Sequence, residues 1–387
     1  GVQSSIPQGL PGRKVKTGIE VLSAESFLPL KGMRVGLITN HTGIDSEGRR
    51  TFDLLRNAPG LKLSALFSPE HGLTGKDDRK VSSTVEPVTG LPVYSLYSSV
   101  RKPTEEMLND LDALVFDIQD VGVRFYTYIT TMGYAMEAAA KKGIAFYVLD
   151  RPNPINASSV QGPVMDKDLA SFTGYFPLPL RHGMTVGELA EMFNAENRIG
   201  AELHVIKMSG YNRADWYDDS GLRWIDPSPN LHSLTEAILY PGVALVEGAN
   251  VSVGRGTDTP FELLGAPWIN AEKLAAFLKS RKIKGVSFAP VDFVPGKDIY
   301  KNKACHGVRI TLNDRQSLDV AVMGIEITGV LYKLYPADFQ LDKTLGLIGS
   351  QRVLQALRDG RDPQSIVLEW QSTLTQFLAM RSKYLLY

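Results

Sequence analysis

The sequence predicts an α/β fold in two parts. A Rossmann-like, doubly wound domain is expected over residues 16–240, followed by a smaller α+β domain over residues 241–387. The first support is length, because 387 residues exceed what one hydrophobic core normally serves. The second is pattern: apolar strand-like runs alternate with amphipathic segments in the first half, as in a mostly parallel sheet covered on both faces. Near Tyr240 this alternation stops, which predicts the domain boundary.

The elements of the first domain follow from short apolar runs and from helix start and stop signals. Pro103 suits a helix start, and Gly143 follows a lysine pair as a helix stop should. Strands are expected at residues 33–39, 61–67, 91–96, 113–118 and 145–149, and helices at 51–57, 104–111, 128–142 and 185–197.

The second domain has weaker periodicity. Residues 243–255 have the pattern of a strand followed by a loop. Helices are expected at 270–280 and 318–334, strands at 286–288 and 308–312, and two further helices within 345–384, separated near residues 360–363.

Composition excludes several classes of protein. Lys plus Arg and Asp plus Glu are equal at 42 each, so the chain lacks the basic excess of a nucleic-acid-binding protein. No apolar run approaches the roughly 20 residues that span a bilayer. The single cysteine and the absence of paired histidine motifs predict no metal site. The first predicted strand is followed by no G-x-G-x-x-G, so no cofactor is expected and an NAD-dependent enzyme is a minority hypothesis.

The segment SPEHG at residues 68–72 follows the predicted strand 61–67. That strand should deliver Glu70 and His71 to the carboxyl edge of the sheet, where ligands bind in open α/β folds. A carboxylic acid beside an imidazole suits proton transfer. The alternative is a strand-ending turn in which Glu70 caps the next segment.

Two further strands also end in polar residues. After the strand at 113–118, the segment DIQDVGVRFY at 117–126 offers carboxylates, an amide and an arginine, for which a structural ion-pair network is the alternative. After 145–149, DRPNP at 150–154 holds Arg151 and Asn153 outward on a stiff loop. His182 could face the same crevice or pack in the core, whereas Thr185 and Glu188 form a capping box.

In the second domain, EGANVSVGRGT at residues 247–257 is dense in glycine and hydrogen-bonding side chains. Its glycines allow close approach of the backbone to a ligand or serve a turn only. Asn250, Arg255 and Thr257 suit sugar hydroxyls or a carboxylate.

These motifs together carry a resemblance to a known family. In order along the chain, NHTG at 40–43, SPEHG, DIQDVGVRFY, DRPNP and EGANVSVGRGT are similar to those of the NamZ exo-β-N-acetylmuramidases. The resemblance implies a Rossmann-like domain, a smaller second domain and an active site in the cleft between them. It also implies release of terminal N-acetylmuramic acid from the non-reducing ends of peptidoglycan fragments, with Glu70 as the catalytic glutamate.

The resulting hypothesis is an exo-acting glycoside hydrolase with Glu70 as general acid. His71 and Asp117 would assist, Asp120 is the first candidate for the second carboxylate, and Glu247 is the next. Muramic acid carries a lactyl carboxylate, for which Arg124, Arg151 and Arg255 are the candidate partners. The other expected substrate contacts are Asn40, Gln119, Tyr126, Asn153, His182, Asn250 and Thr257.

A non-catalytic protein that binds cell-wall sugars in the same cleft is the alternative function. Turnover of peptidoglycan implies a periplasmic or secreted setting, and the linker-like residues 1–16 are consistent with a removed signal peptide. The expected partner is a peptidoglycan-derived oligosaccharide or disaccharide.

Overall fold

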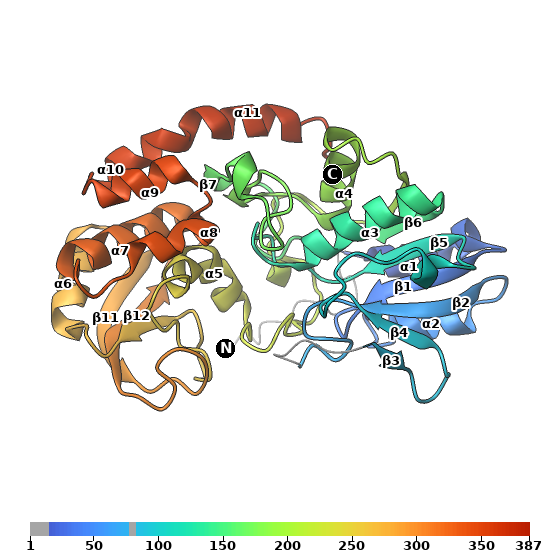
Figure 1. The fold of residues 1–387 in the computed structure, drawn as a ribbon, viewed down its shortest axis with the longest axis horizontal. Coiled ribbons are helices and arrows are strands. Elements are labelled where there is room, and N and C mark those ends of the chain that lie inside the picture. The colour runs from blue at the N-terminus through green and yellow to red at the C-terminus, as the bar shows by residue number, and fades with distance from the viewer. Residues whose placement is uncertain (1–14, 77–82) are drawn as a thin grey trace, which may run out of the picture.

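The computed structural model describes residues 15–76 and 83–387. A seven-stranded sheet organises the first half of the chain, in the order β3-β4-β2-β1-β5-β6-β9 (Figure 1). Its strands are β1 (Arg34–Thr39), β2 (Lys62–Ser68), β3 (Thr84–Val85), β4 (Pro92–Ser95), β5 (Ala113–Asp117), β6 (Ala145–Leu149) and β9 (Glu202–Ile206). All neighbouring pairs are parallel except β3 with β4. The five predicted strands are confirmed to within one residue at each end, whereas β3 and β9 were not predicted.

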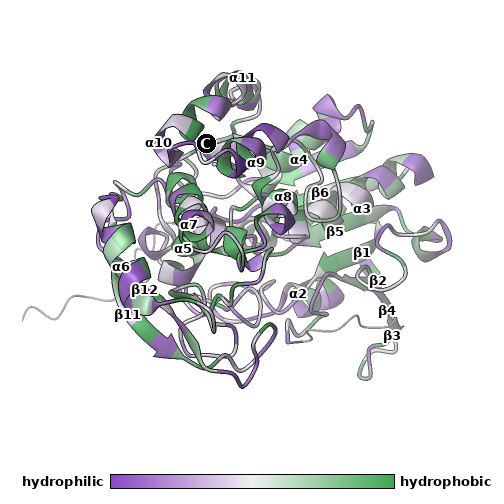
Figure 2. Ribbon diagram, turned by 60° about the vertical axis from the view of Figure 1, so that its left-hand side comes forward, coloured by the Kyte–Doolittle hydropathy of each residue, from purple (hydrophilic) through white to green (hydrophobic). Residues whose placement is uncertain are grey.

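Helices cover both faces of this sheet. On one face, α1 (Gly18–Ala24) and α2 (Thr51–Asn57) pack on alternate strand residues such as Val35 and Leu37. On the other, α3 (Tyr128–Lys142) and α4 (Val186–Glu196) pack on Ile38 and its neighbours. The central strands are accordingly hydrophobic along their length, as Figure 2 shows for β1 and β5. The doubly wound Rossmann-like fold is therefore confirmed.

Helix ends follow the sequence signals in most places. Thr185 caps α4 with the predicted capping box to Glu188, and Gly143 ends α3 at a left-handed φ of 76°. The helix expected at 104–111 is wrong, because only the 3₁₀ turn Glu106–Leu108 forms there. Asp110 adopts a left-handed φ of 65°, which no α-helix accommodates.

The second half of the chain forms an α+β domain. Its antiparallel sheet has the order β10-β12-β11, and the helix α5 packs against α7 (Figure 1). The elements are α5 (Leu234–Glu247), β10 (Leu263–Ala266), α6 (Ala271–Ser280), β11 (Val286–Phe293), β12 (Cys305–Leu312) and α7 (Val320–Leu334).

The strand and loop predicted after residue 243 are wrong up to Glu247. Helix α5 continues through Pro241, so the predicted domain boundary at 240/241 falls inside it. Ser233 caps the helix through the backbone N–H of Glu236, and every residue from Glu236 to Val246 is buried. A proline inside a helix costs stability. In α5 this cost is offset because the helix is buried against α7 and against the rest of the hydrophobic core.

The C-terminal segment returns to the first domain. After α8 (Leu345–Ile348), α9 (Gln351–Arg358) and α10 (Pro363–Ile366), helix α11 (Gln371–Arg381) spans the two domains (Figure 1). The predicted break near residues 360–363 is confirmed, but this segment forms four α-helices where two were expected. Arg381 donates to the carbonyls of Ala157 and Gly183, and the Tyr387 hydroxyl donates to Asp150 Oδ2 over 2.7 Å. A two-stranded sheet of β7 (Gln161–Val164) and β8 (Pro179–Arg181) lies in the same region. Among the described residues, no helix is long and apolar enough to cross a membrane.

Candidate active site

A cavity of about 210 Å³ lies where the two domains meet. The first domain contributes Glu70 and His71, from the end of β2, and the segment before α3. The second contributes α5 and the segment at 255–261. The lining residues are Glu70, His71, Phe125, Tyr126, Thr127, Thr173, Ser228, Asn230, Leu231, Tyr240, Ala244, Glu247, Arg255, Phe261 and Leu347. Five predicted site residues, Glu70, His71, Tyr126, Glu247 and Arg255, therefore share one cavity.

Glu70 is held by side chains from other segments. The Thr127 hydroxyl donates to Glu70 Oε2, and Tyr97 lies close enough for the carboxylate to act on its hydroxyl. Burial, together with the negative charge of Glu70, raises the pKa of Tyr97. The turn that carries Glu70 is sharp, since His71 and Gly72 both have a left-handed φ of 71°. The carboxylate is thus fixed in the cavity wall by Thr127, with Tyr97 beside it, and sequence reasoning selected neither residue.

Asp120 is buried and is not among the residues that line the cavity. Its Oδ2 accepts from the backbone N–H of Gly122 over 3.1 Å, whereas its Oδ1 has no hydrogen-bond partner among the described residues. His182 Nε2 lies 3.8 Å from Oδ2. Because His182 Nδ1 accepts from the Met184 backbone over 3.2 Å, the ring proton of neutral His182 is on Nε2, facing Asp120. Asp120 and His182 therefore form a buried pair that lies behind the residues lining the cavity.

Three tyrosines, Tyr126, Tyr128 and Tyr240, form a cluster near Glu70 and Asp120. Tyr126 lies 4.9 Å from Tyr128 and 5.9 Å from Tyr240, measured between ring centroids, and both contacts are edge-on. Burial raises the pKa of Tyr128 and Tyr240, and the charges of Glu70 and Asp120 add to the effect. These phenols stay protonated at neutral pH, and the Tyr128 hydroxyl donates to the Pro227 carbonyl over 2.6 Å. Tyr240 was interpreted from sequence only as the end of the first domain.

Asp117 and Arg151 form the structural ion pair that was the alternative for this motif. Arg151 Nε lies 2.6 Å from Asp117 Oδ1, and Arg151 Nη2 lies 3.0 Å from Oδ2. Both side chains are buried; burial disfavours the charged guanidinium, but the Asp117 carboxylate outweighs it and raises the pKa of Arg151. The Thr51 hydroxyl also donates to Asp117, and Arg151 also donates to the Ile44 carbonyl. This pair joins the β1–α2 loop to the edge of the sheet, outside the cavity.

Arg124 is placed between the domains instead of facing the cavity. Its guanidinium donates to the carbonyls of Pro163 (2.9 Å) and Leu178 (3.0 Å) in the first domain, and of Leu347 (2.5 Å) and Ile348 (2.9 Å) in the second. All of these contacts are structural.

The amide side chains near the sheet edge organise loops. Asn40 Oδ1 accepts from the Thr42 backbone over 2.9 Å, Gln119 Nε2 donates to the Pro152 carbonyl over 2.8 Å, and Asn153 Nδ2 donates to the Met184 carbonyl over 3.0 Å. None of the three is a lining residue of the cavity.

In the glycine-rich segment of the second domain, Arg255 lines the cavity, whereas Asn250 and Thr257 make contacts elsewhere. Arg255 forms a bidentate pair with Glu247, with Nη2 to Oε1 at 2.8 Å, and its Nε lies 3.6 Å from Asp298. Burial opposes the charge of Arg255, but Glu247 outweighs it and raises the pKa of the guanidinium. Asn250 points elsewhere, bonding to Asp338 and Gln340, and Thr257 donates to Gly254 within its own turn. A Cβ at Gly256 would lie 2.5 Å from Gly296, so this glycine permits contact between backbones and not with a ligand.

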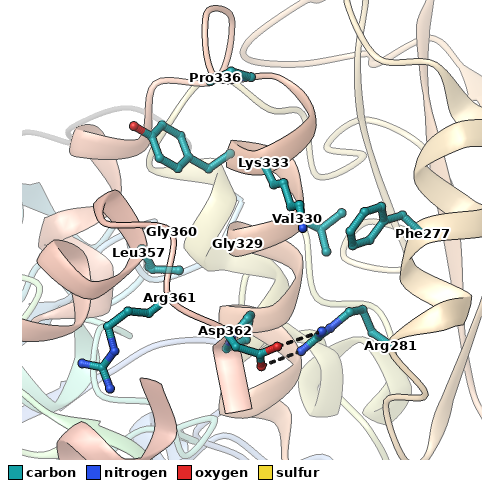
Figure 3. Close-up of a pocket in the computed structure, with 12 residues that line it drawn as sticks. Phe277, Arg281, Gly329, Val330, Lys333, Pro336, Leu357, Gly360, Arg361 and Asp362 are labelled. Carbon is teal, nitrogen blue, oxygen red and sulfur yellow. Dashed lines mark hydrogen bonds and ion pairs between the residues drawn. The ribbon is translucent and has the colours of Figure 1, made fainter. Parts of the chain in front are cut away.

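A second cavity, of about 470 Å³, lies in the C-terminal domain between α6, α7 and the α9–α10 turn (Figure 3). Its one lining carboxylate, Asp362, pairs with Arg281 at 3.0 Å. Acid–base chemistry with two carboxylates is therefore better served by the interdomain cavity. Among the described residues, no group of three or more His, Cys, Asp or Glu side chains could hold a metal ion.

Comparison with known proteins agrees with this arrangement. The model of the N-terminal domain of exo-β-N-acetylmuramidase NamZ matches residues 35–235, and that of its C-terminal domain matches residues 238–387. The chain is 44% identical over 379 residues to the peptidoglycan β-N-acetylmuramidase NamZ of Bacillus subtilis (strain 168), covering 97% of this chain and 92% of that protein.

Two crystal structures of DUF1343 family proteins from Bacteroides fragilis NCTC 9343 share the fold. One has a TM-score of 0.91 at 38% identity and covers 97% of this chain and 100% of its own. The other has a TM-score of 0.77 at 33% identity and covers 96% and 99%. With both domain models matched in order across the interdomain cavity, this chain belongs to the NamZ family of exo-β-N-acetylmuramidases.

Proposed function

We propose that this protein is an exo-acting glycoside hydrolase that removes terminal β-linked N-acetylmuramic acid from peptidoglycan fragments, with Glu70 as its general acid. The observation that carries the proposal is the Glu70 carboxylate, fixed by Thr127 in the wall of an interdomain cavity. Glu70 gives its proton to the glycosidic oxygen as the bond from that oxygen to the anomeric carbon breaks. Water then supplies the hydroxyl of the released muramic sugar, and its second proton restores Glu70.

The activity is tested with a muramoyl-β-1,4-glucosamine disaccharide, N-acetylated on both sugars, and its glucosaminyl counterpart. Release of free N-acetylmuramic acid from the first substrate supports the proposal. Saturable binding of either sugar without cleavage would instead establish the non-catalytic sugar-binding function. An NAD-dependent enzyme would show a melting temperature raised by saturating NAD, which this proposal does not expect.

The second carboxylate is proposed to be Asp120, with Glu247 as the alternative. Asp120 lies behind the cavity wall, but its Oδ1 has no hydrogen-bond partner among the described residues and is free to hold a water between itself and the cavity. Both oxygens of Glu247 are bound by Arg255. Asp120→Asn is therefore expected to reduce kcat by about 10²-fold or more, and Glu247→Gln by less. A deeper loss in Glu247→Gln, with both variants folded, would exchange the two assignments.

Arg255 is proposed to bind the lactyl carboxylate that distinguishes muramic acid from glucosamine. Of the three candidate arginines, Arg255 is the one that lines the cavity, whereas Arg124 and Arg151 use their guanidinium groups in structural contacts. Glu247 engages Nε and Nη2 of Arg255, and Nη1 has no hydrogen bond within the described part of the chain. That nitrogen is available to a substrate carboxylate.

Arg255→Ala is expected to lower kcat/KM for the muramoyl disaccharide by about 10²-fold, because a charge-assisted hydrogen bond to substrate is lost. Any slow cleavage of the glucosaminyl disaccharide should change far less. Arg309→Ala, an exposed arginine of the same domain, is the matched control. Equal losses on both substrates would refute this role for Arg255 and leave it as the partner of Glu247.

The protein is also proposed to act in the periplasm or outside the cell, in cell-wall turnover and recycling. The support is the place of the substrate, since peptidoglycan is assembled and degraded outside the cytoplasmic membrane. Muramidase activity recovered in the periplasmic or secreted fraction agrees with this setting. Activity confined to the cytoplasmic fraction would point to recycling of imported fragments.

A further inference from the structure

Beside the cavity, three aromatic rings and one arginine form a surface cluster, here called the aromatic shelf: Tyr97, Tyr134, Phe172 and Arg101. Tyr97 stacks on Phe172 with centroids 5.5 Å apart and planes 24° apart, and Tyr134 lies 6.2 Å from Phe172. The rings come from three segments: the one after β4, helix α3 and the loop after β7. Phe172 is buried beneath the others, whereas Tyr97 and Tyr134 are partly exposed.

The shelf begins at the proposed general acid. The charge of Glu70 acts on the Tyr97 hydroxyl, which places the two side chains close together, and Thr173, next to Phe172 in the chain, lines the cavity. Arg255 and Glu247 come from the other domain. The groups proposed to bind the muramoyl sugar and the shelf therefore flank Glu70 from different domains. Since the general acid protonates the oxygen of the leaving group, a platform next to it is placed to receive the leaving sugar. Partly exposed aromatic rings offer the apolar faces on which sugar rings pack.

Arg101 adds a charge at the edge of this platform. Its guanidinium carbon lies 4.1 Å from the centroid of the Phe172 ring and 5.6 Å from that of Tyr97. The neighbouring Lys102 pairs with Glu137 at 3.4 Å, but Arg101 has no ion-pair partner within the described residues. An arginine held flat on rings keeps its N–H edge free for a carboxylate.

We propose that the aromatic shelf is the leaving-group subsite, and that Arg101 binds the carboxylate of the muramoyl residue that follows the leaving sugar in the glycan chain. The two sugars of peptidoglycan alternate, so in a peptide-free strand a terminal muramoyl unit is followed by a neutral glucosaminyl unit and then by a second muramoyl unit with its own lactyl carboxylate. The neutral unit packs on the partly exposed rings of Tyr97 and Tyr134, which Phe172 supports from beneath, and the next carboxylate reaches Arg101. The enzyme therefore prefers chains longer than a disaccharide. This inference rests on the proposed hydrolase function.

The test compares kcat/KM for the disaccharide and for a peptide-free tetrasaccharide of two repeats, with wild type, Arg101→Ala and Phe172→Leu. Wild type is expected to favour the tetrasaccharide by about tenfold, the worth of one charge-assisted contact. Arg101→Ala should remove that preference, because it lowers kcat/KM far more for the tetrasaccharide than for the disaccharide. Phe172→Leu should weaken the preference, because Arg101 loses the ring that holds it. Arg56→Ala, an exposed arginine of α2, is the control and should behave as wild type.

Two further substrates identify the charge that Arg101 binds. Converting the internal lactyl carboxylate of the tetrasaccharide to a neutral amide should abolish the preference in wild type. If only a tetrasaccharide with an acidic stem peptide is preferred, and Arg101→Ala removes that preference, the lactyl assignment is overturned in favour of a peptide carboxylate. An identical tetrasaccharide-to-disaccharide ratio in wild type and Arg101→Ala overturns the subsite and leaves the hydrolase function intact. Failure of wild type to cleave either substrate overturns both.

Discussion

Glu70→Gln is expected to lower kcat on the muramoyl disaccharide by about 10²–10⁴-fold, the range that general acid catalysis supplies. Glutamine keeps the size of the side chain and an oxygen that accepts from Thr127, so the fold and the cavity wall should persist. What it lacks is the proton for the leaving glycosidic oxygen. Steady-state kinetics and the melting temperature, measured together, separate loss of chemistry from loss of structure.

A substrate with an activated leaving group makes this test specific for the acid. In an aryl muramoside the leaving group is an aryl oxide, which departs without being protonated. Glu70→Gln should therefore lose much less activity on this substrate than on the disaccharide. Glu105→Gln, whose side chain is 79% exposed, is the control for a change of charge alone. Equal losses on both substrates would argue that Glu70 has another role, and full activity in the folded variant would move the acid to Asp120 or Glu247.

The site could be located from sequence because it depends on strand ends. Polar residues follow β2 and β5, and parallel strands bring their carboxyl ends to one edge of a sheet. Apolar runs fixed those ends to within a residue, so the positions of Glu70 and Asp120 near the edge were predictable. The strand order is a second reason to expect a site there. The chain adds β2 and β4 on one side of β1 and then β5 and β6 on the other, so the strand order reverses at β1.

The roles of individual polar residues were less predictable, because they depend on partners that are far away in sequence. Arg151 and Arg255 are both arginines in short polar motifs, yet one closes a buried pair with Asp117 and the other lines the cavity. Thr127 was not selected from sequence; it stands at the N-cap position of α3, where a threonine usually caps the helix, but its side chain makes no such bond. Its contact with Glu70, 57 positions away, exists only in the folded chain.

Local signals also fail where tertiary packing is strong. Pro241 and Gly242 predict a break, but α5 continues because Gly242 allows close contact with α7: a Cβ there would lie 2.3 Å from the Val320 carbonyl oxygen. This helix carries Tyr240, Ala244 and Glu247 to the cavity on three successive turns, so the misassigned segment is the one that completes the site.

Arg124→Met is expected to destabilise the protein by about 3–5 kcal/mol, as for loss of a buried charged group whose partners remain. Methionine has a similar length and no donors, so the carbonyls of Pro163, Leu178, Leu347 and Ile348 would lose the guanidinium. The guanidinium is 1% exposed, which leaves water little access to replace it. Urea unfolding followed by tryptophan fluorescence measures the change, with Arg352→Met, at a side chain that is 79% exposed, as the control expected to shift by less than about 1 kcal/mol.

The same substitution should affect catalysis, because Arg124 holds Leu347 and Leu347 lines the cavity. Loosening this contact lets α8 move relative to the first domain, which widens the site and weakens substrate positioning. At a temperature where Arg124→Met is fully folded, KM for the disaccharide should therefore rise, while Arg352→Met should leave it unchanged. Arg124→Lys, which keeps the charge but has fewer donors, should fall between wild type and Met in both stability and KM. Wild-type stability and KM in Arg124→Met would mean that the interdomain contact survives on its apolar packing alone, and that the four carbonyls find water instead.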